Sequence, residues 1–363
     1  MKILIIGEFS AFAKHLKNGF RLLGNDVTVV QTGDGWKGLG NSEDIMMSTR
    51  NPSILGFELR GLNRIKAPYI RYKVKRQIEE KCPNPDIIIV INYIFLSSSL
   101  FQCGVPIQYV QRLLNQGSKL IMSICGQEPA MHYRYPEVCA AMGLRKIREN
   151  KRHLFLLKNA NTIVPTCYSY FDSICHYSQD KGYDVSKITH SVPLPMTVDD
   201  NYSITSCEER KIVIFHGVIR PKAKGTPYIK KAMERIQQEY PDRVECVCEG
   251  GLPYDDYVKL FEKVDILIDQ TYGNGWGINA AIGAMKGKCV LTCCGKENEE
   301  DMRIADIPFV QIIPDELQIY RVLKDLVLNP QKIDEIKKKS RAFIVNDCEC
   351  SKIADRYIHF VGV

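Results

Sequence analysis

Long apolar runs are missing from this sequence of 363 residues. The longest near-continuous run, residues 87–91, is far shorter than the ~18–20 apolar residues that a membrane-spanning helix requires. The first apolar stretch, residues 3–6, runs straight into a glycine, whereas a signal peptide needs a longer apolar region and a small-residue cleavage site. These absences predict a cytoplasmic protein without a membrane span.

Paired metal ligands and a glycine-rich dinucleotide motif are also absent. The 14 cysteines include no Cys-x-x-Cys pair, and several lie inside apolar segments, so we expect reduced, buried thiols and no metal site. No Asp-x-Asp triplet is present that would hold a metal–diphosphate complex. The first apolar stretch is followed by Gly7 alone and not by Gly-x-Gly-x-x-Gly, which argues against a nicotinamide-dependent dehydrogenase.

The net charge of +7 is unevenly spread. Residues 1–195 contain 25 Lys and Arg against 15 Asp and Glu, whereas the remainder contains 24 against 27. Residues 60–81 form a basic segment that predicts peripheral contact with an anionic membrane at its inner face, or with another anionic partner. A solvated basic face is the alternative, and nucleic acid is the least favoured partner because no aromatic residues are interleaved on an exposed sheet. The basic residues of the segment are Arg60, Arg64, Lys66, Arg71, Lys73, Lys75, Arg76 and Lys81.

Apolar stretches alternate with helical patterns along the first half of the chain. Residues 2–7 form an apolar run ended by glycine, and a helical apolar face and a second apolar run, 27–30, follow it. Strands that are apolar throughout are typical of a parallel sheet covered on both faces, so this pattern predicts a β-α-β unit. Further strands are predicted over residues 86–92, 119–124 and 162–165.

A proline-bearing polar stretch near residues 192–202 interrupts this alternation, which then restarts. We predict strands over residues 211–217, 244–248, 265–268 and 288–292, with helices between them and from about residue 315 onward. The fold class is therefore α/β, with two doubly wound, Rossmann-like domains that face one another across a ligand-binding cleft. The predicted domains are residues 1–195 and 210–345, and residues 346–363 form a C-terminal helix able to pack back on the first domain.

The first candidate site lies between the strand that ends at Gly217 and the next helix. Several cations, backbone N–H groups freed by glycine and a helix start are what a bound diphosphate requires. Negative charge builds on a diphosphate as a sugar–phosphate bond breaks, and fixed cations lower that barrier. We assign Arg220 and Lys224 to catalysis, and His216, Gly217 and Lys222 to nucleotide-sugar binding. A solvated basic loop is the alternative.

The second candidate site is a loop with glycine at three alternate positions, 273, 275 and 277. Glycines between a strand and a helix permit positive φ and close approach of a ligand to backbone N–H groups. We predict that Gly275, Trp276, Gly277, Ile278 and Asn279 bind the nucleotide sugar. A flexible turn is the alternative for the loop, and Trp276 fits a pocket wall and a core position equally well.

Candidates in the first half follow the ends of two strands, so we expect them at the carboxyl edge of the sheet, facing the cleft. His132 or Glu128 is predicted to orient or deprotonate an acceptor hydroxyl, with Arg134 beside them on the acceptor side. A loop histidine and a helix-start glutamate are the alternative. Gly7, with Glu8 and Ser10 at the end of the first strand, is predicted to line the same cleft and to contact the nucleotide sugar or the acceptor.

Taken together, the loops of the second half resemble the donor-binding half of the GT-B glycosyltransferases, in particular glycosyltransferases group 1 (family 4). The resemblance extends over residues 212–361 and rests on the order and spacing of several pieces. These are Arg220…Lys224-Gly225-Thr226 and residues 251–257, 264–270, 273–277, 284–290 and 340–343. It implies transfer of a sugar from a nucleotide-diphosphate sugar to a glycan or lipid-phosphate-linked acceptor, with retention of configuration and no cofactor. Lys and Arg then replace a metal ion.

One departure from the family concerns two glutamates eight positions apart, which contact the donor sugar and the ribose. Gly275 and Gly283 stand at those positions here. Asn274, Asn279 or the acidic run 297–301 are the candidate substitutes. Two alternatives to a transferase therefore stay open: a nucleotide-sugar 2-epimerase of the same two-domain architecture, and a non-catalytic relative that binds nucleotide sugars.

Overall fold

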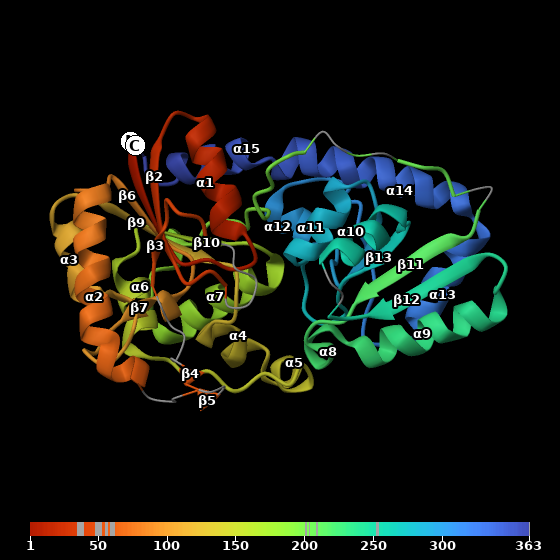
Figure 1. Cartoon of the computed structure of the whole chain (residues 1–363), viewed down its shortest axis with the longest axis horizontal. Helices are drawn as coiled ribbons and strands as arrows, with labels where there is room; N and C mark the ends of the chain where they lie inside the picture. The colour runs from red at the N-terminus through yellow and green to blue at the C-terminus, as the bar shows by residue number, and fades with distance from the viewer. Residues whose placement is uncertain are drawn as a thin grey trace.

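The computed structural model describes residues 1–34, 40–47, 53–54, 57–58, 62–199, 202, 204–207, 210–251 and 254–362. The side chains of residues 53–54, 57–58, 62–63 and 254–258 are not part of that description. Arg60, residues 252–253 and residues 200–201, 203 and 208–209 of the expected linker lie outside the described residues. Figure 1 shows two parallel sheets, one in each half of the chain, which confirms the predicted fold class.

The first sheet has six parallel strands in the order β10-β9-β6-β1-β2-β3. The strand order reverses between β1 and β6, and parallel sheets of this kind bind ligands at the carboxyl edge of such a point. The strands are β1 (Lys2–Ile6), β2 (Asp26–Gln31), β3 (Ile45–Met46), β6 (Ile87–Val90), β9 (Lys119–Ile124) and β10 (Thr162–Pro165).

Helices cover both faces of this sheet because its strands are apolar on both sides. Ile3 and Ile5 of β1 pack into one buried cluster, and Leu4 and Ile6 pack into another on the opposite face. The helices are α1 (Phe12–Leu22), α2 (Leu62–Lys81), α3 (Ile107–Asn115), α4 (Pro129–Arg134), α5 (Pro136–Ala141), α6 (Lys151–Asn159) and α7 (Tyr168–Lys181). Shorter elements are β4 (Ser53–Ile54) with β5 (Phe57–Glu58), β7 (Leu96–Ser97) with β8 (Val105–Pro106), and the 3-10 turns Tyr93–Phe95 and Val185–Lys187.

The second sheet has five parallel strands in the order β12-β11-β13-β14-β15, with the reversal between β11 and β13. Its strands are β11 (Ile212–Gly217), β12 (Val244–Glu249), β13 (Ile266–Ile268), β14 (Cys289–Thr292) and β15 (Val310–Gln311). The helices are α8 (Pro221–Lys224), α9 (Thr226–Glu239), α10 (Tyr254–Lys263), α11 (Ile278–Met285), α12 (Glu297–Met302), α13 (Glu316–Leu328) and α14 (Pro330–Phe343). Every strand predicted from the sequence is present, within one or two residues.

The chain returns to the first half at its end. After α14, a π-helical turn (Ile344–Cys348) leads into α15 (Cys350–His359), which lies beside α1 (Figure 1). The hydroxyl groups of Tyr357 and Ser123 are 2.8 Å apart, so α15 also contacts β9. Gly19 is buried where the two helices cross, and a Cβ there would lie 2.0 Å from the carbonyl oxygen of Cys350.

No helix among the described residues is long and apolar enough to cross a bilayer. All fourteen cysteines have free thiols, and most of them are buried.

Replacing Gly19 tests the contact between α1 and α15. In an exposed helix, Gly→Ala raises stability by about 1 kcal/mol. Here we expect Gly19→Ala to lower the free energy of unfolding by about 1–3 kcal/mol, because the added methyl group forces α15 outward. Urea unfolding followed by circular dichroism measures the change. Leu22→Ala, at an exposed position of the same helix, is the control with little effect. A stabilised Gly19→Ala protein would contradict the tight crossing.

Candidate functional site

The carboxyl edges of the two sheets meet at the start of α7. A Cβ on Gly275, in the loop after β13, would lie 2.5 Å from the Cβ of Cys167, which follows β10. The backbone N–H of Tyr168 donates to Oδ1 of Asn298 at 3.0 Å, and that of Ser169 donates to the carbonyl of Asn274 at 3.1 Å. The first N–H groups of a helix have no partner within the helix. Residues of the second half therefore cap a helix of the first half.

Arg220 and Lys222 lie on the short segment between β11 and α9, close to the first half. Arg220 is exposed and has a left-handed backbone, with φ 56°. Burial raises the pKa of Tyr170, on α7, well above its ordinary value, and the positive charge of Arg220 opposes this rise. The side chain of Lys222 packs on Gly143, whose Cβ would lie 3.2 Å from the lysine Cδ. Both cations thus lie where the two halves approach one another.

Lys224 is held by a buried carboxylate at the carboxyl end of β13. Its Nζ lies 2.7 Å from Oδ1 of Asp269, and the N–H of Gly277, the N-cap of α11, points to Oδ2 of the same carboxylate at 3.3 Å. Burial alone would raise the pKa of Asp269, but the charge and hydrogen bond of Lys224 hold it below its usual value. One carboxylate therefore fixes both a cation and the start of α11. Among the described residues, Asp269 is the only side chain bonded to Lys224.

Three predicted binding residues occupy the expected places. Gly217 ends β11, and Ile278 and Asn279 form the first turn of α11, all half-buried. Because β11 and β13 are neighbours in the sheet, Gly217 and the loop that leads to α11 start from the same carboxyl edge as the Lys224–Asp269 pair. Their binding role stays a prediction.

Two other side chains assigned to nucleotide-sugar binding lie in the interior instead. His216 is fully buried, with Nδ1 2.8 Å from the carbonyl of Ile268 and Nε2 2.8 Å from Oγ1 of Thr226. Burial lowers the pKa of His216 to about 4, so the ring is neutral and both nitrogens are used. Trp276 is 6% exposed and packs edge-on against Phe309 and Phe343. This geometry argues against ligand contacts by either ring and favours a core position for Trp276.

Close packing explains the two glycines that stand where the family has glutamates. A Cβ on Gly283 would lie 2.4 Å from Cδ2 of Leu267, because α11 packs tightly on β13. Gly275 has φ 155°, and Cys167 occupies the space that a side chain at this position would need. A glutamate at either position would displace buried neighbours. Among the proposed substitutes, the side chain of Asn274 donates to Glu297 at 2.9 Å within the second half, and the backbone N–H of Asn274 donates to Oγ of Ser169, in the first half, at 2.6 Å.

The acceptor-side candidates lie in the first half, where Glu128 and His132 are buried and Arg134 is paired. Glu128 is 1% exposed, accepts a 2.8 Å hydrogen bond from Nδ2 of Asn92, and has its pKa raised well above the usual value by burial. His132 is 6% exposed, and burial followed by the charge of Lys146 lowers its pKa. Nε of Arg134 lies 2.8 Å from the Asp172 carboxylate. Among the described residues, no hydrogen bond or ion pair joins His132 to Arg220 or Lys224, and the joint catalytic role of the three stays a prediction.

Glu8 lies in the β1–α1 loop, where its carboxyl group has a role that the sequence did not indicate. Its buried carboxyl group accepts hydrogen bonds from the N–H groups of Ala13 at 3.2 Å and Lys14 at 3.0 Å, in the first turn of α1. Ser10 and Ala11, which lie between Glu8 and α1, have positive φ angles of 52° and 70°, and such angles are costly for residues other than glycine. This tight turn lets the carboxyl group of Glu8, from within the loop, accept the free N–H groups at the start of α1.

Gly7, which precedes Glu8, has a packing role. A Cβ on Gly7 would lie 2.3 Å from the ring of Phe95, and its φ of 111° belongs to the region that favours glycine. Contact of Gly7 with a ligand stays a prediction.

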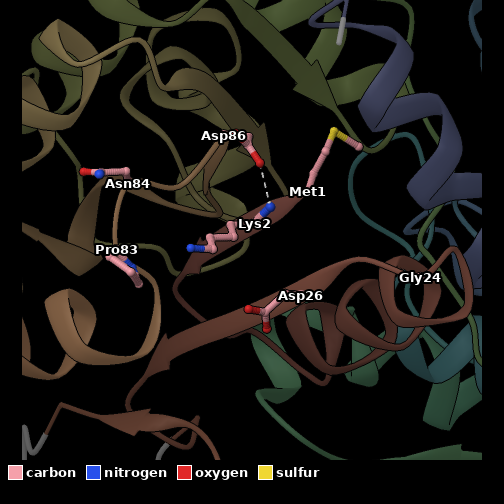
Figure 2. A pocket seen from close by; sticks show the side chains of 7 residues that line it. All are labelled: Met1, Lys2, Gly24, Asp26, Pro83, Asn84 and Asp86. Carbon is pink, nitrogen blue, oxygen red and sulfur yellow. Dashed lines mark hydrogen bonds between the residues drawn. The ribbon is translucent and has the colours of Figure 1, made fainter.

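A surface pocket lies at the opposite edge of the first sheet (Figure 2). Its lining includes Lys2, whose N–H donates to Asp86 at 2.7 Å, and Asp26 at the start of β2. Ligands of parallel sheets bind at the carboxyl edge, whereas these residues stand at the amino edge. We therefore assign the pocket no part in the site. Across the described part of the chain, no group of three His, Cys, Asp or Glu side chains is placed to hold a metal ion.

Comparison with known proteins shows the fold. No family model matches the sequence, and no curated protein matches it. Sucrose-phosphate synthase from Thermosynechococcus elongatus aligns over 99% of this chain and 97% of its own, with a TM-score of 0.62 and 13% identity. Anabaena Alr3699/HepE in complex with UDP and glucose aligns over 99% and 98%, with a TM-score of 0.61 and 12% identity. The chain has the GT-B fold.

A third similar structure belongs to a different class of enzyme. A protein from Listeria monocytogenes assigned as a UDP-N-acetylglucosamine 2-epimerase aligns over 98% of this chain and 94% of its own, with a TM-score of 0.52 and 14% identity. At such identities the likeness concerns the GT-B fold and not the activity. The assignment to glycosyltransferases group 1 remains a resemblance.

The Glu8 carboxyl group predicts a pH dependence of stability. Burial, the largest cause, raises the pKa of Glu8 from 4.5 to about 7, while the hydrogen bonds from Lys14 and Ala13 oppose it. Between pH 4.5 and about pH 7, the folded protein keeps a proton on Glu8 that the unfolded chain has lost. The free energy of unfolding therefore falls as the pH rises through this range. We expect Glu8 to contribute a decline on the order of 3 kcal/mol over this window, and Glu8→Gln to remove it.

Urea unfolding at a series of pH values from about 5 to about 8 measures this slope. The comparison concerns slopes and not absolute stabilities, since an amide keeps only one acceptor oxygen. Glu137→Gln, at an exposed position of α5, is the matched control with the slope of the unchanged protein. An unchanged slope in Glu8→Gln would show that Glu8 ionises normally in the folded protein.

Proposed function

We propose that this protein is a glycosyltransferase that moves a sugar from a nucleotide-diphosphate sugar to a glycan or lipid-phosphate-linked acceptor. The observation that carries the proposal is the arrangement of Lys224, Asp269 and Gly277, which places an ammonium group beside the start of α11. Cations and helix starts stabilise phosphate groups. The exposed Arg220 adds a second cation on the side of the first half. UDP bound in a protein of the same fold, HepE, supports a nucleotide donor.

In the proposed reaction, the bond between the anomeric carbon and the diphosphate oxygen breaks, and its electron pair stays with the diphosphate. An ammonium group has three N–H donors, and Asp269 takes one of those of Lys224. The remaining donors, with Arg220, meet the charge that develops on the diphosphate and so lower the barrier. The acceptor hydroxyl attacks the anomeric carbon and gives its proton to a phosphate oxygen, since Glu128 and His132 are buried.

Metal independence and retention of configuration are further parts of this proposal. The first follows from having lysine and arginine in place of a metal ion. The second follows from the resemblance to glycosyltransferases group 1. Gly275 and Gly283 leave the sugar and the ribose to other groups, for which the half-buried Asn279 at the start of α11 is our candidate.

Removal of the two cations tests the proposal. Thermal-shift screening with UDP, GDP and their sugars identifies the donor, and transfer is then measured with EDTA present. We expect Arg220→Ala with Lys224→Ala to lower turnover by about 10²–10³-fold, because the departing diphosphate loses its charge partners. Turnover at an unchanged rate would refute this diphosphate site, and loss of turnover in EDTA alone would refute metal independence.

Two controls separate chemistry from folding. Lys224→Ala leaves the Asp269 carboxylate buried without its partner, so its thermal midpoint is measured as well. Arg220→Ala alone changes an exposed residue, and we expect it to lower turnover while the protein stays folded. Lys230→Ala with Lys231→Ala removes the same charge from the exposed face of α9 and is expected to leave turnover unchanged.

A nucleotide-sugar 2-epimerase is the second candidate, favoured by the likeness to the Listeria protein. Epimerisation requires no acceptor, so incubation with UDP-N-acetylglucosamine alone separates the two functions. We expect no conversion to the 2-epimer, because glycines stand at positions 275 and 283 in place of carboxylates and the Asp269 carboxylate is held by Lys224 and Gly277. Formation of the epimer would replace the transferase proposal. Tight binding of a nucleotide sugar with no turnover would instead favour the non-catalytic relative.

A further inference from the structure

Helix α2 carries apolar side chains on two opposite faces. Ala67, Val74 and Ile78 are buried against the first sheet. Ile65, Tyr69 and Tyr72 point the other way and are 72%, 69% and 63% exposed. Their spacing, i, i+4 and i+7, places them in one stripe on the outer side. A helix on the surface of a soluble protein normally has charged and polar residues on that side.

A neighbouring turn adds two further apolar side chains. Leu100 and Phe101 are 63% and 64% exposed. A guanidinium N–H of Arg71 donates to the carbonyl of Ser99, which ties this turn to α2. We call Ile65, Tyr69, Tyr72, Leu100 and Phe101 the outer apolar patch. Several exposed apolar groups on one helix and on the turn bonded to it indicate an interaction surface, whereas single exposed apolar residues need no explanation.

Positive charge surrounds the patch. Arg64, Lys66 and Lys73 are exposed, and no ion pair joins them to an acidic group in the described ranges. Arg76 and Lys75, further along α2, are instead paired with Glu80 and Glu79. The cations near the start of the helix are therefore free to meet an external anion, whereas those near its end are compensated.

The patch also has a defined position relative to the proposed site. The end of α2 leads into β6, so it lies at the amino edge of the sheet, and the start of α2 lies toward the carboxyl edge. The turn with Leu100 and Phe101 follows β6 and lies beyond the same edge. In Figure 1, α2 runs along the outside of the first half.

We propose that the outer apolar patch and the cations around it dock the protein on the surface of an anionic lipid bilayer. Aromatic and aliphatic side chains enter the boundary between headgroups and acyl chains, and Lys and Arg meet the anionic headgroups. Tyrosine suits this boundary because its ring is apolar and its hydroxyl stays in water. The charge complementarity and the stripe of Tyr with Lys and Arg favour a lipid surface over a protein partner. The further point, that docking presents the carboxyl edge to a lipid-linked acceptor, rests on the proposed function.

Vesicle co-sedimentation tests the docking without any enzymatic readout. The full-length protein is mixed with vesicles of phosphatidylcholine alone, or of phosphatidylcholine with phosphatidylglycerol. We expect binding to the anionic vesicles only, weakened by high salt. Replacing four patch residues together, as Ile65→Ser, Tyr69→Ser, Leu100→Ser and Phe101→Ser, is expected to weaken binding by about tenfold or more. Lys66→Glu with Lys73→Glu is expected to abolish the preference for anionic vesicles.

Leu22→Ser with Leu317→Ser is the matched control, since these leucines are exposed at 69% and 42% outside the patch. We expect it to bind like the unchanged protein, and all variants to keep their circular dichroism spectra. Equal binding to neutral and anionic vesicles, or full binding by the four-residue variant, would overturn the proposal. Sedimentation velocity adds a third outcome: a dimer that the four-residue variant loses would assign the patch to self-association instead. Donor binding, measured separately, tests the proposed function and is expected to be the same in all of these variants.

Discussion

The ion pair between Lys224 and Asp269 organises the second half of the molecule. Asp269 is almost fully buried, and a carboxylate in that position is costly unless a cation meets it. Lys224 supplies that cation, and in return its flexible side chain is held in one place. The same carboxylate receives the N–H of Gly277, so the pair joins α8, β13 and α11. Breaking such a pair typically costs about 3–5 kcal/mol, because a buried charge remains alone.

Close packing around this pair limits which side chains the site can carry. Gly225, Gly275 and Gly283 each leave no room for a Cβ, because Thr271, Cys167 and Leu267 fill the space. These contacts bring the loops between strands and helices near one another and near the first half. At the two positions where glycosyltransferases group 1 has glutamates, this chain instead has glycines that allow close contacts with Cys167 and Leu267. On the proposed function, recognition of the sugar is left to backbone groups and to the polar side chains at the start of α11.

The strands could be predicted because a parallel sheet buries both faces and leaves continuous apolar runs in the sequence. Two-residue strands such as Ile45–Met46 leave no such run. The cations after β11 were also recognisable, since they stand between a strand and a helix. The partner of Lys224 could not be recognised, because Asp269 is 45 positions away in the sequence and only the fold brings the two side chains together. The burial of Trp276 depends in the same way on the distant Phe309 and Phe343. The apolar stripe on α2, by contrast, was present in the sequence at helical spacing but was obscured by the basic residues around it.

The two halves use the N–H groups at the start of a helix near their switch points differently, and this difference supports the proposed place of the diphosphate in the second half. In the first half, both oxygens of Glu8 accept N–H groups of α1, and burial leaves this carboxyl group largely protonated below about pH 7. The position that a phosphate takes in many Rossmann-like domains is therefore filled by the protein itself. In the second half, one oxygen of Asp269 accepts the N–H of Gly277, at the helix start, and the other oxygen bonds Lys224. On the proposed function, the ammonium group of Lys224 and the exposed Arg220 then provide the positive charge that an anionic donor group requires.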